Sequence, residues 1–111
     1  MNGLKEDHIR AQWQEMEAVQ RKYSDIQIFK GIEADILPDG SMDYRDDLLA
    51  EFDFTIASVH SRFNLTEDDQ TRRICRALTN PYVTMLGHPT GRLLLSRAGY
   101  RVDMSQVIRT A

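Results

Sequence analysis

Apolar side chains recur along this chain at two spacings, and the change of spacing divides the sequence into helices and strands. From Lys5 to Lys22 they recur every three or four positions, which predicts an amphipathic helix with a charged outer face. The apolar positions assigned to this helix and its end are Ile9, Trp13, Met16, Val19 and Tyr23.

Three short runs of apolar and β-branched residues predict strands at Ile26 to Ile32, Asp53 to Val59 and Tyr82 to Leu86. The first run leads toward Leu37-Pro38-Asp39-Gly40-Ser41, which is a strong turn signal. Proline fixes φ in such a turn, and glycine is free to take a positive φ.

Capping residues indicate where the other helices begin and end. Thr66, followed by an acidic first turn, predicts the N-cap of a helix that stops at Asn80-Pro81. Asp103 and Gln106 resemble a capping box that opens a short final helix. Asp46 to Glu51 is at most a short helix.

The resulting order is α-β-α-β-α-β-α, which predicts an α/β fold with about three parallel strands joined by right-handed crossovers. Parallel sheets are normally larger and covered on both faces. A complete eight-fold barrel needs roughly 250 residues, whereas this chain has 111. We therefore expect a partial (β/α) barrel, whose uncovered strand edges would make the isolated chain self-associate.

Composition narrows the class of protein. With 41% hydrophobic and 28% charged residues the chain reads as globular, and it shows neither a signal peptide nor a membrane span. The single cysteine, Cys75, fits a reducing compartment and a predicted apolar helix face, so we expect a cytoplasmic protein and a structural thiol. The net charge of −3 argues against a basic nucleic-acid-binding module, although metals can supply the charge that a nucleic-acid substrate needs.

Glu33, His60 and His88 are the main candidates for chemistry. They lie 27 and 28 positions apart, about one βα unit, and each falls near the end of a predicted strand. Parallel strands end at one edge of their sheet, so these side chains should meet there and could share a divalent metal. Each alone has a plainer interpretation: an acidic strand end, a hydrogen-bonded histidine or a capping histidine.

Neighbouring residues add further possibilities. Asp35 is on the same side of an extended strand as Glu33 and could face the same cation. Arg92, in a loop fixed by glycine and proline, could form paired hydrogen bonds to a phosphate. A serine-histidine mechanism would need a nucleophile elbow, which the sequence lacks. An EF-hand calcium loop over Asp35 to Asp46 would need a ligand at its third position, which is Leu37. His8 is expected to face solvent.

Three motifs then carry a resemblance: Gly31-Ile32-Glu33-Ala34-Asp35 with the following turn, Ser58-Val59-His60-Ser61, and His88-Pro89-Thr90-Gly91-Arg92. With these motifs the chain resembles the PHP (polymerase and histidinol phosphatase) domain, in particular the C-terminal PHP domain of bacterial and archaeal family X DNA polymerases. On this resemblance, residues 1–111 are a single segment from the central part of such a domain.

The resemblance implies a distorted barrel that holds divalent metals and hydrolyses phosphoesters. The resemblance makes Glu33, His60 and His88 the expected metal ligands, which would act in catalysis through the bound metal. It makes Arg92 an expected phosphate contact. Manganese is the cofactor it favours, with zinc and iron as alternatives, and DNA is the implied substrate of a 3′-5′ exonuclease.

Other ligands of the family pattern are absent from this sequence, so we expect the fragment alone to be inactive. Asp7-His8 has the letters of one missing motif but lies in a predicted helix. Two alternative functions stay open: a small-molecule phosphatase of the histidinol phosphatase type, and a non-catalytic structural or interaction module of a polymerase.

Overall fold

The computed structural model describes residues 3–111, and the chain divides into two compact units, residues 1–30 and 31–111. The first unit is helix α1 (Glu6–Gln20) followed by an irregular segment. The Gln20 side chain anchors that segment, because it accepts a hydrogen bond from the Ile28 N–H at 2.8 Å and donates to the Ile26 carbonyl at 2.7 Å.

The predicted apolar stripe of α1 is only partly buried. Ile9 and Trp13 are buried, and the Lys30 ammonium lies 5.0 Å from the centre of the Trp13 ring. Val19 and Tyr23, which the periodicity assigns to the same stripe, are exposed. No helix in the described part of the chain is both long enough and apolar enough to span a bilayer.

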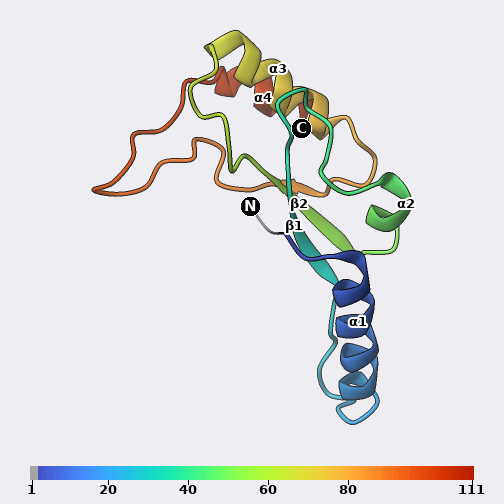
Figure 1. Ribbon diagram of the computed structural model, residues 1–111. Helices are drawn as coiled ribbons and strands as arrows, with labels where there is room; N and C mark the ends of the chain where they lie inside the picture. Colours follow the sequence, from blue (N-terminus) through green and yellow to red (C-terminus); the bar gives the residue numbers. More distant parts are fainter. Residues whose placement is uncertain (1–2) are drawn as a thin grey trace. The chain divides into compact units, whose positions relative to one another are not determined.

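The second unit is a three-stranded sheet with helices, and its elements are shown in Figure 1. They are β1 (Gly31–Asp35), α2 (Asp46–Leu49), β2 (Phe54–Ser58), α3 (Glu67–Leu78), β3 (Met85–Leu86) and α4 (Met104–Thr110). The strands run parallel in the order β1-β2-β3. The predicted α/β class with three parallel strands is confirmed.

Two strands are shorter than predicted. β1 begins at Gly31 rather than at Ile26. The β1–β2 ladder starts with the pair Gly31 and Phe54, so residues 26–30 have no partner in it. β3 covers only Met85 and Leu86 of the predicted run, which pair with Ile56 and Ala57. A strand needs a ladder partner, so an apolar run without one stays irregular.

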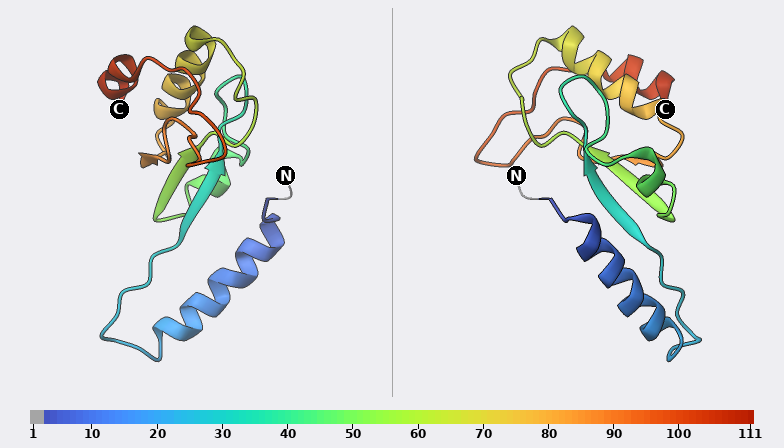
Figure 2. Two further views of the ribbon diagram at one scale, coloured as in Figure 1. Left: turned by 90° about the vertical axis from the view of Figure 1, so that its left-hand side faces the viewer. Right: turned by 45° about the vertical axis from the view of Figure 1, so that its right-hand side comes forward.

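The helix ends follow the predicted caps, with one correction. The Thr66 hydroxyl accepts from the Asp69 N–H at 3.2 Å, and the Asp103 carboxylate accepts from the Gln106 N–H at 3.0 Å. The return bond of a capping box would run from the Asp103 N–H to Gln106, but this N–H donates to the Thr71 hydroxyl at 2.9 Å. That bond ties the start of α4 to α3, and the two helices lie side by side in Figure 2.

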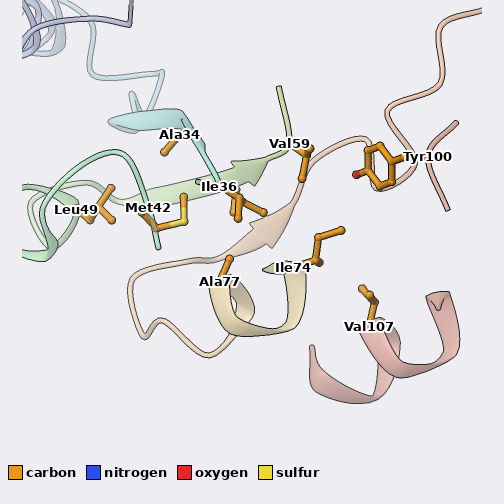
Figure 3. Packing of buried hydrophobic residues seen from close by; sticks show 10 residues of the cluster. Ala34, Ile36, Met42, Leu49, Val59, Ile74, Ala77, Tyr100 and Val107 are labelled. Carbon is orange, nitrogen blue, oxygen red and sulfur yellow. The ribbon is translucent and has the colours of Figure 1, made fainter. Parts of the chain in front are cut away.

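The core lies between the sheet and α3, as Figure 3 shows. Alternate strand residues face it: Ala34 and Ile36 from β1 and its end, Ala57 and Val59 from β2 and its end. Ile74 and Ala77 approach from α3, and both are completely buried. Cys75 is half-buried against this cluster, where its sulfur accepts a hydrogen bond from the Thr110 hydroxyl.

The turn at Leu37–Ser41 closes as predicted. The Ser41 carbonyl accepts from the Leu37 N–H at 2.8 Å, and Gly40 takes a φ of +87°. A Cβ at position 40 would also lie 2.7 Å from the Arg73 carbonyl oxygen. Glycine is therefore required both by the backbone conformation and by the close approach of this turn to α3.

Candidate metal centre

The alternation of strand residues separates the polar side chains from the core. Ala34 is buried against α3, so its neighbours Glu33 and Asp35 project from the opposite face of β1. Glu33 pairs in register with Ile56, and Asp35 pairs with Ser58. Val59 is buried in the core, so His60, the next residue after it, lies on the same side as Ser58.

The structure brings the three predicted residues together. One ligand atom from each of Glu33, His60 and His88 lies within 4.8 Å of the other two. His60 Nε2 is 3.1 Å from Glu33 Oε1, and His88 Nε2 is 2.9 Å from the same oxygen. The two imidazole rings have their centres 5.1 Å apart. This proximity is observed, whereas the role of the residues as ligands stays a prediction.

A local backbone feature lets His88 reach across the sheet. His88 has a φ of +23° and starts a turn in which the Gly91 N–H donates to its carbonyl at 2.9 Å. Gly87, just before it, packs so closely on β2 that a Cβ there would lie 2.3 Å from the Ser58 hydroxyl. The absence of a side chain at position 87 therefore allows β3 to approach Ser58 on the polar face.

The carboxylate of Glu33 has a pKa below its ordinary value. The largest cause is the nearby Ser58 hydroxyl, burial opposes it, and the contacts with His88 and His60 lower the pKa further. Ser58 is fully buried, and its hydroxyl makes no well-formed hydrogen bond within residues 3–111, so it influences Glu33 by proximity. Glu33 is thus held in the ionised form, which is the form that binds cations.

The donor set fits a metal cation. A neutral imidazole has one N–H donor and one lone pair, yet both ring nitrogens of His60 face carboxylate oxygens, those of Glu33 and Asp35. One of these contacts therefore places a nitrogen lone pair against a negative oxygen unless a proton or a cation lies between them. Glu33, His60 and His88 together offer one oxygen and two nitrogen ligands, a set that suits zinc, manganese or iron.

Asp35 lies beside the cluster rather than within it. Its carboxylate contacts His60 Nδ1, on the opposite edge of the imidazole ring from Nε2. The Asp35 backbone is held on both sides by Asp43, whose carboxylate accepts from the Asp35 N–H at 2.8 Å and whose N–H donates to the Asp35 carbonyl at 3.0 Å. The sequence gives no spacing signal for the Asp43 contact, which depends on how the turn folds back.

Arg73 is a second residue that sequence reasoning missed. It is 2% exposed, and its guanidinium donates to the carbonyls of Ile36, Leu37 and Ser61. These carbonyls belong to the segments that leave β1 and β2, so Arg73 ties both of them to α3. Desolvation lowers the pKa of Arg73 from its ordinary value. An arginine on the apolar stripe of a helix is the only signal that could have identified it.

Arg92 is exposed and lines a hollow together with residues 93 and 95–98. This segment belongs to the long loop between β3 and α4, drawn in orange in Figure 1. Among residues 3–111 no hydrogen bond or ion pair joins Arg92 to Glu33, His60 or His88. Its role as a phosphate contact therefore stays a prediction.

Comparison with known proteins gives several clear similarities, although no family model matches the chain. The chain is 47% identical over 110 residues to the DNA polymerase/3'-5' exonuclease PolX of Bacillus subtilis. It is 36% identical over 96 residues to a protein of Caldicellulosiruptor bescii named "Probable phosphatase", and 31% identical over 100 residues to another of that description from Caldanaerobacter subterraneus.

These alignments include nearly all of this chain but only part of each relative. The PolX alignment covers 99% of the chain and 19% of PolX. The two phosphatase alignments cover 84% and 86% of the chain, and 38% and 37% of the respective relatives. The chain thus matches part of a protein named as a polymerase and exonuclease, and part of shorter proteins named as phosphatases. Both kinds of name are consistent with a segment of a phosphoesterase.

Proposed function

We propose that this chain is the central segment of a PHP domain and forms part of its (β/α) barrel. The complete domain, within a family X DNA polymerase, hydrolyses phosphodiesters at DNA ends, and the segment alone is inactive. The observation that carries the proposal is the convergence of Glu33, His60 and His88 at one position on the polar face of the sheet. The similarity to PolX over 99% of the chain supports DNA as the substrate.

In this proposal Glu33, His60 and His88 hold a divalent cation, with manganese preferred. A divalent cation supplies, when bound, the Lewis acidity and the nucleophilic water that phosphoester hydrolysis requires. Glu33 contributes a carboxylate whose lowered pKa keeps it ionised. The imidazoles contribute nitrogen ligands from the segments that follow β2 and β3, and Arg92 contacts a substrate phosphate from the exposed loop.

The strongest test uses the full-length protein that contains this chain. With Mn²⁺ we expect it to shorten a 5′-labelled DNA oligonucleotide from its 3′ end, as seen on a denaturing gel. Glu33→Ala should reduce the rate by more than about 100-fold, because a direct ligand should matter more than the outer partners that cost 10–100-fold. His8→Ala is the matched control, since His8 is exposed on α1.

A second candidate is a small-molecule phosphatase, and the similarity to proteins named as phosphatases favours it. The same preparation should then release phosphate from p-nitrophenyl phosphate or histidinol phosphate faster than it shortens DNA. Undiminished exonuclease activity in Glu33→Ala would contradict the proposed site. Metal binding without hydrolysis of either substrate class would instead indicate a structural or interaction module.

A further inference from the structure

His60 lies between two carboxylates, and only one of them belongs to the three-residue cluster. Its Nε2 atom faces Glu33, while its Nδ1 atom contacts the carboxylate of Asp35. We propose that the Asp35 carboxylate accepts a hydrogen bond from the Nδ1–H of His60 and so leaves the Nε2 lone pair free to bind the metal. This inference rests on the proposed function and assigns Asp35 as a positioning residue.

The position of Asp35 separates it from a direct ligand. The atoms that converge within 4.8 Å come from Glu33, His60 and His88, and Asp35 is not among them. Its carboxylate instead meets the ring nitrogen that points away from Glu33. A ligating histidine usually donates its other N–H to a carboxylate or carbonyl, which fixes the ring orientation and the proton position. Asp35 supplies such a carboxylate.

The surroundings of Asp35 hold this carboxylate in place. Asp35 is the last residue of β1, and the next N–H, that of Ile36, donates to the Ser58 carbonyl at 2.8 Å. Asp43 binds both its N–H and its carbonyl. The Asp35 side chain is 28% exposed and the Glu33 side chain is 45% exposed. Solvent therefore screens the contact of His60 with Asp35 less than its contact with Glu33.

The arrangement has a chemical consequence for His60. An imidazole without a fixed acceptor at Nδ1 can carry its proton on Nε2, and a protonated Nε2 has no lone pair for a cation. With Asp35 in place, the proton stays on Nδ1 and the lone pair points toward Glu33. The acidic end of β1 thereby has two roles. Glu33 holds the cation, and Asp35 orients His60, the ligand that follows β2.

The test compares metal affinity and proton position in the full-length protein. Zn²⁺ is the probe, because it is diamagnetic and suits the same donor set. Calorimetry should give a Zn²⁺ affinity about 10–100-fold weaker for Asp35→Ala than for wild type. Asp35→Asn keeps an oxygen that can accept the hydrogen bond from Nδ1–H, so this variant should bind Zn²⁺ nearly as well as wild type. Asp68→Asn, which removes an exposed carboxylate on α3, should bind like wild type.

The second measurement reports the proton directly. In Zn²⁺-loaded protein with ring-¹⁵N histidine, we expect the His60 proton on Nδ1 in wild type and in Asp35→Asn, with faster solvent exchange in Asp35→Ala. His60→Gln identifies the resonance. A wild-type proton on Nε2 would overturn the inference, and so would Zn²⁺ binding by Asp35→Ala equal to wild type. Failure of wild type to bind Zn²⁺ or Mn²⁺ would overturn the proposed function itself.

Discussion

The two faces of the sheet are built from alternate residues of the same strands, yet different forces order them. On the core face Ala34, Ala57 and Ile74 are completely buried, and apolar packing fixes their positions. On the polar face Glu33 is 45% exposed and is held by hydrogen bonds and charge. The candidate site therefore depends on core packing for its framework, while the core needs little from the site.

The largest expected effect comes from the core face. Ile74→Ala should destabilise the protein by about 3 kcal/mol, because it removes buried methylene groups and leaves a cavity between α3 and the sheet. Urea unfolding measures the loss. Ile108→Ala, at an exposed position of α4, is the control and should change stability by less than about 0.5 kcal/mol. Equal losses in the two variants would contradict the view that packing on the core face stabilises the fold.

A smaller effect is expected where a polar group lies within the core. Tyr100 is 8% exposed, and its hydroxyl has no hydrogen-bond partner among residues 3–111. Tyr100→Phe should therefore stabilise the protein at neutral pH by about 1 kcal/mol, since it removes an unsatisfied buried group. A clear loss of stability in thermal unfolding would indicate that this hydroxyl is satisfied.

The same residue also gives a pH signature, which adds to this difference at high pH. Desolvation raises the pKa of Tyr100 to about 12 from its ordinary value of 10.0. A raised pKa means that its contribution to stability is fully present below pH 10 and is lost as the pH rises toward 12. Wild type should therefore lose stability across this window relative to Tyr100→Phe, and parallel curves would contradict the assignment.

The smallest effect on stability is expected at the polar face. The pKa of Glu33 is lowered from 4.5, chiefly by the Ser58 hydroxyl. Its stabilising contribution is thus present above about pH 4.5 and disappears as the pH falls through the lowered pKa. Glu33→Gln should cost less than about 1 kcal/mol at neutral pH, because the group is solvent-screened. The difference from wild type should vanish in acid, and a difference that grows in acid would be inconsistent with this site.

The sequence predicted best the elements that carry their own signals. β2 is a β-branched and aromatic run, and α3 lies between a threonine cap and a proline stop, so both agree with prediction to within one or two residues. The start of β1 was wrong because Ile26 to Lys30 has no ladder partner. Its apolar character alone could not reveal that.

The same distinction applies to the candidate site. Equal spacing along parallel strands was enough to predict that Glu33, His60 and His88 meet. It could not predict that Asp43 holds the backbone of Asp35, or that Arg73 bridges two loops, because both depend on turns folding back onto distant elements. Sequence periodicity determines which face a residue occupies, and loop geometry determines its neighbours.

The alternation in β1 also bears on how the chain finds its correct pairing during folding. A slip of β1 by one residue would turn Glu33 and Asp35 toward Ile74 and would move Ala34 to the opposite face. Two carboxylates would then lose their hydration inside an apolar core, at a cost far above that of an ordinary mispairing. The acidic residues of the candidate site thus disfavour the registers that lie one residue away from the native pairing of β1 with β2.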